Sequence, residues 1–173
     1  MKLTDTTRKF ILHWGEMGTR WGINRSVAQI HALLYVSPAP LPADEIAEIL
    51  DIARSNVSGS LRELQGWGLA RVTHLLGDRR DHFETTKDVW AMVGIILDGR
   101  KRRELDPTVK MLRECTQELD EQKAEEAYTE ERLNELLGLV ELAAAWCERA
   151  QKLSPEALRR LLKLSDRIFK LVE

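Results

Sequence analysis

The sequence predicts a mainly helical fold with one small β-hairpin, an α+β arrangement that continues into long C-terminal helices. Two observations support this prediction. Apolar residues recur at helical spacing through most of the 173-residue chain. Between two such regions, "RVTHLLGDRRDHFETT" places branched and apolar residues on both sides of the turn formers Gly77 and Asp78, as in two strands joined by a tight turn.

The composition is typical of a globular protein, with 43% hydrophobic and 31% charged residues. No apolar run reaches the roughly 18 residues of a membrane-spanning helix, and the start of the chain lacks the apolar stretch of a signal peptide. The two cysteines, Cys115 and Cys147, have no close cysteine or histidine partner, so neither a disulfide nor a metal site is expected. We therefore expect a cytoplasmic protein that has no membrane partner.

The first half of the chain is expected to open with two helices. The first runs from Thr4 to about Trp21, where aromatic and apolar residues recur at helical spacing. Ser26 is expected to cap the second helix, because a serine side chain can accept a hydrogen bond from a free N–H of the first turn. The prolines of "SPAPLP" (37–42) then end that helix.

Two shorter helices, "ADEIAEIL" (43–50) and "RSNVSGSLREL" (54–64), are expected next, separated by a few residues. Two helices joined in this way can place the second in the major groove of DNA while the first crosses the backbone. Asparagine can pair with adenine and arginine with guanine. The second helix buries an apolar face, and the residues left for DNA are Arg54, Ser55, Asn56, Ser58, Gly59 and Arg62.

The hairpin is expected to present Arg79 and Arg80 at its tip, where side chains are most exposed. Arginine suits the negative potential of a narrow minor groove, and we expect one of the two to enter the groove and the other to hold the backbone. Asp78 is expected to pair with an arginine rather than to face phosphates. The sequence does not decide which arginine takes which role.

Charge is distributed unevenly along the chain, although the net charge is only −2. Positions 54 to 80 contain five basic and two acidic residues, whereas positions 114 to 135 contain nine acidic and two basic residues. This pattern predicts that the first region meets an anion and that the second avoids it. A further basic cluster, "GRKRRE" (99–104), is expected to be solvated or ion-paired rather than bound to phosphate.

The rest of the chain is expected to be helical, with breaks near Asp106-Pro107, Tyr128-Thr129 and Ser154-Pro155. Its apolar residues exceed what a few separate helices can bury, which favours a two-fold homodimer over a monomeric bundle. A dimer would place two recognition helices one turn of DNA apart, about 34 Å, on a pseudo-palindromic operator.

The segment "ADEIAEILDIARSNVSGSLRELQGWGLARV" followed by "GDRRDHFE" resembles the winged helix-turn-helix of the MarR superfamily of bacterial and archaeal transcription regulators. "FILHWGEMGTRWGINRSVAQIHALLYVSPAPLPADEIAEIL" and "ILDGRKRRELDP" resemble its GbsR-like branch. The resemblance implies a dimer built from the first and C-terminal helices, recognition by the helix that begins near Arg54, and Arg79 at the wing tip. Pro42 and Ala53 depart from the family, which often has a capping residue there; a lost cap costs about 1 kcal/mol.

These inferences divide the chain into three regions. Residues 1–21 form a helix of the dimer interface, residues 22–90 form the winged helix-turn-helix DNA-binding domain, and residues 91–173 form a helical dimerisation region. The expected function is that of a homodimeric, sequence-specific DNA-binding transcription regulator, a repressor that responds to a small molecule. The alternative is a winged-helix module that docks proteins or shapes DNA without recognising an operator.

Two readings of the tryptophans remain open. Aromatic faces can bind a quaternary ammonium group through cation–π attraction, and the GbsR-like resemblance suggests choline or a related osmolyte precursor as the effector. The other reading makes these residues core anchors. The candidate ligand residues are Trp14, Trp21, Trp67 and Trp90.

Catalysis is not expected, and neither is a cofactor. "HWGEMG" lacks the two histidines, four residues apart, of a zinc-protease helix, and the chain has no glycine-rich phosphate loop. Ser55 and Ser58 have no nearby histidine to activate them.

Overall fold

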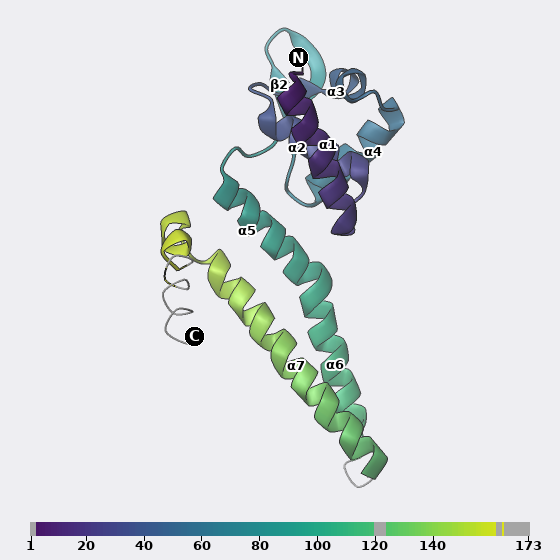
Figure 1. Cartoon of the computed structure of the whole chain (residues 1–173), viewed down its shortest axis with the longest axis vertical. Helices are drawn as coiled ribbons and strands as arrows, with labels where there is room; N and C mark the ends of the chain where they lie inside the picture. The colour runs from purple at the N-terminus through teal and green to yellow at the C-terminus, as the bar shows by residue number, and fades with distance from the viewer. Residues whose placement is uncertain (1–2, 120–123, 162–163, 165–173) are drawn as a thin grey trace. The chain divides into compact units, whose positions relative to one another are not determined.

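The structure is a computed structural model that describes residues 3–119, 124–161 and 164. The chain divides into two compact units, Met1–Met92 and Val93–Glu173. The predicted fold class is confirmed, because the described residues are mainly helical and include one small antiparallel sheet (Figure 1). None of the described helices is both long enough and apolar enough to span a membrane.

Two closely packed helices, α1 (Asp5–Arg20) and α2 (Arg25–Val36), begin the first unit. A Cβ atom added to Gly18 would overlap the side chain of Ala28, so the missing side chain allows the two backbones to approach. This contact explains why a glycine is found in the last turn of α1, although glycine within a helix otherwise costs stability.

Both helices begin with a side-chain cap. The Thr4 hydroxyl accepts a hydrogen bond from the N–H of Thr7, at 3.2 Å, at the start of α1. At the start of α2, Asn24 Oδ1 accepts from the N–H of Ser26, at 2.8 Å. The prediction that Ser26 is the cap is therefore wrong: the chain becomes helical at Arg25, and the asparagine before it occupies the capping position.

Helices α3 (Ala43–Leu50) and α4 (Arg54–Gly66) complete the helical core together with α2. Between them Asp51 adopts a left-handed conformation, with φ of 53°, which ends α3 and turns the chain. Burial of each large apolar side chain in such a core stabilises the fold by about 1.5–3 kcal/mol. The core side chains on these helices are Val27, Ile30, Leu33, Leu34, Ile46, Val57, Leu61 and Leu64.

The sheet has three antiparallel strands, β1 (Leu41–Pro42), β2 (Arg71–Leu75) and β3 (Asp78–Glu84), in the order β1-β3-β2. Strands β2 and β3 are the predicted hairpin. The sequence did not predict β1, since its prolines indicated only the end of a helix. Pro42 is tolerated because β1 is an edge strand, where a missing N–H breaks no internal pairing.

Lys87 ties the segment after the sheet to the end of α2. Its Nζ donates to the backbone carbonyls of Leu34, Tyr35 and Ser37. The last carbonyls of a helix have no partner within the helix, and a cation at this end also interacts favourably with the helix dipole. Partial burial lowers the pKa of Lys87.

His31 makes folding sensitive to pH. Burial, and to a smaller extent the charge of Lys87, lower the pKa of this histidine from 6.5 to about 4. As the pH falls, His31 is protonated in the unfolded chain before it is protonated in the folded chain. Neutral His31 therefore makes its full contribution to the free energy of unfolding above pH 6.5, and this contribution declines toward pH 4. Acidification from about pH 7 to about pH 5 should lower the free energy of unfolding by about 2 kcal/mol through this residue.

Urea denaturation at several pH values measures this effect. The His31→Gln protein, which cannot titrate at this position, should show a flatter dependence over the same pH range. Equal slopes for the two proteins would exclude His31 as the source.

The second unit continues the chain as a long helical hairpin. Helix α5 (Val89–Arg100) leads through a π-helical segment, η1 (Lys101–Leu105), into α6 (Asp106–Glu118), and α7 (Ala124–Gln151) returns antiparallel beside α6 (Figure 1). The C-terminal end of the predicted dimerisation region, residues 165–173, lies outside the described residues.

The first of the three predicted helix breaks coincides with the boundary at which the π-helical segment η1 ends at Leu105 and α6 begins at Asp106. Pro107 lies in the first turn of α6, a position that proline favours. The second predicted break is wrong, because helix α7 passes through Tyr128 and Thr129. The third break is confirmed: Ser154 Oγ accepts from the N–H of Ala157 at 3.2 Å, and residues 155–161 are helical.

The basic cluster of residues 99–104 is ion-paired, as predicted. Arg100 pairs with Glu104 at 3.2 Å. Lys101 pairs with Asp106 at 2.8 Å, and this hydrogen bond raises the pKa of the lysine. Arg102 pairs with Asp98 one turn earlier.

Candidate nucleic-acid interface

Helix α4 turns one face into the first unit and the opposite face toward solvent. Val57, Leu61 and Leu64 are almost completely buried in the core that α4 shares with α2 and α3. Ser55 and Arg62, on the opposite side of the helix, are exposed. This is the orientation that the sequence predicted, with a polar face available to a partner.

The first turns of α3 and α4 have no side-chain cap. Pro42 precedes α3 and Ala53 precedes α4, and neither supplies a capping hydrogen bond. The helix cap that the sequence predicted to be lost at Pro42 and Ala53 is therefore absent, and this prediction is confirmed. The first backbone N–H groups of α4 therefore keep the partial positive charge that can attract an anion.

Arg54 is held between the two helices of the motif. Its Nε lies 2.5 Å from Asp44 Oδ1 of α3, and its Nη1 donates to the hydroxyl of Ser58 one turn later. Both charged side chains are at least half exposed. The ion pair orients Arg54 along the α3 side of α4.

Asn56 is engaged on the opposite flank of α4. Its Nδ2 donates to Ser26 Oγ of α2 at 3.0 Å, and its Oδ1 accepts from Ser60 Oγ at 3.4 Å. The amide thus fastens the start of α4 to the start of α2, although the residue as a whole is exposed.

The tip of the wing differs from the prediction. The turn that joins β2 to β3 consists of Leu76 and Gly77, and Gly77 has φ of 88°, which favours a residue without a side chain. Arg79 and Arg80 follow on β3 and are not at the apex. The two-residue turn, shifted one position toward the N-terminus from the predicted Gly77-Asp78, places Leu76 at the tip instead.

Asp78 holds Arg80, as the sequence predicted for one of the two arginines. Arg80 Nη2 lies 2.5 Å from Asp78 Oδ2, and Arg80 Nε lies 3.0 Å from Oδ1. These hydrogen bonds hold the pKa of the Asp78 carboxyl well below its usual range. The carboxylate also lies 3.4 Å from Nε2 of buried His82. Among the described residues, no carboxylate pairs with Arg79.

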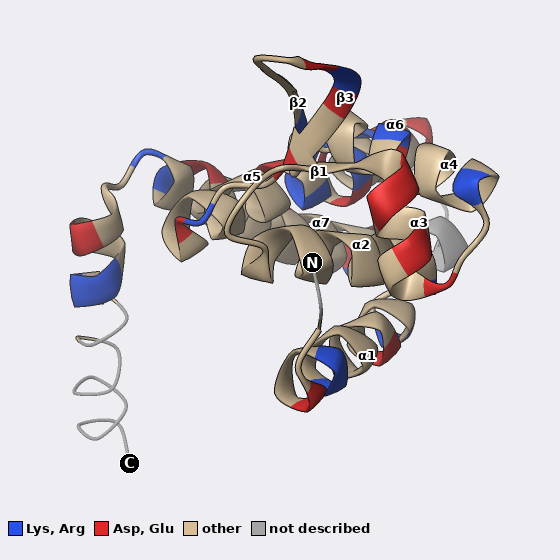
Figure 2. Cartoon of the chain, turned by 90° about the horizontal axis from the view of Figure 1, so that it is seen from above, with Lys and Arg blue, Asp and Glu red and all other residues tan. Residues whose placement is uncertain are grey.

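Two other carboxylates of the wing also have partners. Arg71 pairs with Glu84 at 2.9 Å, and His74 Nε2 lies 3.3 Å from Asp81 Oδ1. Figure 2 shows basic and acidic residues next to each other on β3, and acidic residues along α3. The basic block that the sequence indicated is therefore largely balanced by carboxylates from α3 and from the wing itself.

The α3, α4 and wing elements enclose a groove of about 440 Å³. Three arginines and two aspartates contribute to its lining, together with apolar residues: Arg54, Arg62, Arg80, Asp44 and Asp81. The groove brings Arg54 and Arg62 of α4 and Arg80 of β3 to one side of the first unit.

Replacing Asp78 by asparagine should release Arg80 and strengthen non-specific DNA binding. The variant loses one negative charge and frees one guanidinium group, so the slope of log K against log salt should steepen by about one unit. Fluorescence anisotropy with a random-sequence duplex at several salt concentrations measures both quantities. Glu84→Gln, which frees Arg71 farther from the turn, is the matched control, and equal effects of the two variants would contradict a special role for Asp78.

The predicted ligand tryptophans lie on several elements of the first unit. Trp14 and Trp21 meet edge to face with ring centroids 6.3 Å apart, and Phe10 lies 5.6 Å from Trp14. Trp67 follows the last residue of α4, and Trp90 lies in the first turn of α5. Two members of the predicted ligand set, Trp14 and Trp21, are thus in contact at the C-terminal half of α1.

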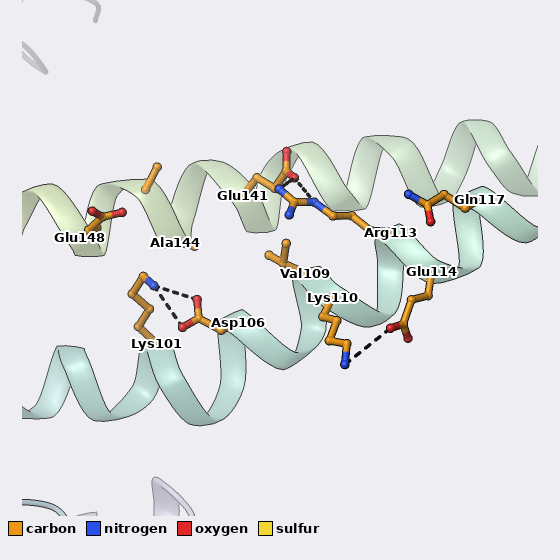
Figure 3. Close-up of a pocket in the computed structure, with 11 residues that line it drawn as sticks. Lys101, Asp106, Val109, Lys110, Arg113, Glu114, Gln117, Glu141, Ala144 and Glu148 are labelled. Atoms are coloured by element: carbon orange, nitrogen blue, oxygen red, sulfur yellow. Dashed lines mark hydrogen bonds and ion pairs between the residues drawn. The ribbon is translucent and has the colours of Figure 1, made fainter.

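A second groove, of about 610 Å³, lies between α6 and α7 (Figure 3). Its charged lining residues pair across or along the helices: Arg113 Nη2 with Glu141 Oε1 at 2.5 Å, Lys110 with Glu114 at 3.7 Å, and Lys101 with Asp106. Only the Arg113–Glu141 pair joins α6 to α7, and the pairs leave none of these six charges unmatched for a ligand. In the part of the chain that the structure describes, no cluster of three or more histidine, cysteine or carboxylate side chains is placed to bind a metal ion.

Comparison with known proteins identifies the fold of the first unit. A family model for the MarR family matches residues 21–81, from the end of α1 into β3. A crystal structure of a transcriptional regulator matches with 17% identity and a TM-score of 0.57, covering 83% of this chain and 99% of that chain. A Staphylococcus aureus MepR mutant bound to an oligodeoxyribonucleotide matches with 17% identity and a TM-score of 0.40, covering 78% and 92%. No curated protein matches the chain.

The matched segment contains both helices of the motif and most of the wing. The fold of this segment is a winged helix-turn-helix of the MarR type. Sequence reasoning found its order of elements and missed β1, the location of the turn and the partners of the arginines. The signal for the turn was the glycine of "LLG". A two-residue hairpin turn favours glycine as its second residue, so the leucine before the glycine is the first residue of the turn.

Proposed function

We propose that the chain is a homodimeric, sequence-specific DNA-binding regulator that acts as a repressor of transcription. The observation that carries the proposal is the exposed polar face of α4, presented beside a wing in a fold of the MarR type. Such a helix fits the major groove, and a wing beside it reaches the neighbouring minor groove. We place the regulator in the cytoplasm and in the GbsR-like branch.

The residues of α4 take different roles in this proposal. Arg62 and Ser55 face outward and contact base edges, and Gly59 between them allows the DNA to approach the backbone. The uncapped first turn receives a phosphate. Arg54, Asn56 and Ser58 contact DNA from the flanks of α4. Arg54, which also contacts Ser58, ties α4 to α3, and Asn56 ties α4 to α2.

Apolar surface in each unit supports a dimer. In the second half of α7 three large apolar side chains are 49–67% exposed, and they lie on the side of the helix opposite the partly buried residues Leu137 and Ala144. On α1 a line of partly exposed residues, including the Phe10–Trp14 cluster, flanks the face packed on α2. A second copy of the chain that covered both surfaces would remove them from water. The three α7 residues are Leu139, Leu142 and Trp146.

The experiment that tests the function is a selection of duplexes from a random pool by the full-length protein. We expect enrichment of one pseudo-palindromic sequence whose half-sites are about 10 base pairs apart, with binding that survives salt concentrations at which random DNA is released. Choline added to the selected complex should release the DNA and change the fluorescence of the Trp14–Trp21 pair. Enrichment of no sequence would contradict operator binding.

A second candidate function is favoured by the paired charges of the wing. With Arg71 and Arg80 held by carboxylates, the wing offers little positive charge, as in a winged helix that docks another protein. The same selection separates the two, because a docking module enriches no duplex at any salt concentration.

A further inference from the structure

Leu76 occupies an unusual position for an apolar side chain. It lies at the apex of the wing, in the two-residue turn between β2 and β3, and its relative exposure is 108%. Its neighbour Leu75 is 42% exposed, so the end of the wing is apolar over two consecutive residues. An apolar side chain wholly in water gains nothing from folding, and its burial elsewhere is favourable.

The surroundings of Leu76 indicate what can bury it. Arg79, on the strand that leaves the turn, is exposed and has no carboxylate partner among the described residues. Asp78 is neutralised by Arg80, and Asp81 lies beside His74. The end of the wing therefore combines an apolar apex with one available cation, which is the composition of a side-chain wedge that acts on DNA from the minor groove.

We propose that Leu76 enters the minor groove beside the recognition site and inserts between two stacked base pairs, so that the DNA kinks there. This inference rests on the proposed function, and in it Leu76 takes the place in the minor groove that was predicted for one of the arginines. Arg79 follows the wedge into the groove or onto the adjoining phosphate. A protein partner that covered Leu76 instead would leave DNA binding unchanged when the leucine is replaced.

The hairpin is built to support such a wedge. Backbone pairing between β2 and β3 continues to Leu75 and Asp78, the two residues that flank the turn. A register irregularity between Thr73 and Leu75 bends and twists the strand just before the apex. Gly77 at φ of 88° closes the turn in two residues, so Leu76 projects from a short and paired support.

A wedge also predicts a preference in the DNA. Pyrimidine–purine steps such as TA and CA unstack more easily than other steps, so inserting a side chain into them costs less. We expect duplexes selected by the full-length protein to contain such a step at a constant distance outside each half-site. If only an arginine of the wing entered the minor groove, the selected duplexes would instead contain A-tracts, whose minor groove is narrow.

The test uses a selected duplex that carries 2-aminopurine at the flanking step and a dye at each end. With the unchanged protein, binding should raise the 2-aminopurine fluorescence as the base unstacks, and energy transfer should report a kink of about 20° or more. Leu76→Ser should lower the affinity about tenfold or more, which corresponds to the burial of one leucine side chain, and should abolish both signals. Leu76→Met, which keeps an apolar side chain, should preserve them.

The outcomes separate this inference from the proposed function. The exposed position of Leu76 means that Leu76→Ser should melt at the temperature of the unchanged protein, so a loss of binding is not a loss of folding. If the selection succeeds and Leu76→Ser binds and bends the duplex like the unchanged protein, the wedge is overturned and operator binding stands. If no duplex is selected, both are overturned.

Discussion

Replacing Leu139 and Leu142 together by glutamate should convert the protein into a monomer. Both side chains are about two-thirds exposed on α7, at 64% and 67%. Two such residues contribute about 3–6 kcal/mol when they are fully buried in an interface, and placing carboxylates there adds a desolvation cost. Sedimentation velocity should show the mass of one chain where the unchanged protein shows two.

The same variant should lose most of its affinity for the selected operator, since only a dimer contacts both half-sites at once. Helicity should be unchanged, because neither side chain supports the fold of a single chain. Asn134→Glu, an exposed position on α7 away from these residues, is the control for added negative charge and should remain a dimer. A double variant that still sediments as a dimer would place the interface elsewhere.

Arg62→Ala should weaken binding to the selected operator by about 1–3 kcal/mol and relax the preference at one base pair of each half-site. Arg62 is exposed on the outer face of α4, and its described hydrogen bond, from Nε to the carbonyl of Ser58 at 3.4 Å, leaves the rest of the guanidinium group available. Competition binding against a series of single base-pair substitutions measures the change.

Arg20→Ala is the matched control, because it removes the same charge from an exposed position at the end of α1. It should lower the affinity for all sequences slightly and equally. If Arg62→Ala lost affinity for the operator and for random DNA to the same extent, Arg62 would be a phosphate contact and not a reader of sequence.

Features that depend on neighbouring residues were predictable from the sequence. The apolar face of α4 follows from the spacing of Val57, Leu61 and Leu64 along one helix. The absent cap at Ala53 follows from the residue type, and the Asp78–Arg80 pair follows from two residues on the same side of a strand. In each of these cases the interacting groups lie within a few residues of each other.

Features that depend on distant residues were not predictable. Strand β1 exists because its two residues pair with β3, about forty positions later, and proline-rich sequence alone indicates only a break. Arg54 is balanced by Asp44 of a different helix, and Asn56 is engaged by Ser26 of a third. Three arginines of the basic block counted along the sequence, Arg54, Arg71 and Arg80, are therefore paired with carboxylates, because the charge at a surface is summed over residues that are close in space.

The hairpin that carries Leu76 contains both kinds of feature, one that the local sequence predicts and one that depends on strand pairing. The composition of "LLGDRRDHF" was sufficient to predict two strands and a tight turn, since glycine and aspartate are turn formers. The residue at the apex depends on which positions of β2 and β3 exchange hydrogen bonds, and the pairing of Leu75 with Asp78 places the turn at Leu76 and Gly77. A shift of one residue in strand pairing changes the face to which each side chain points, and only the folded sheet sets that pairing.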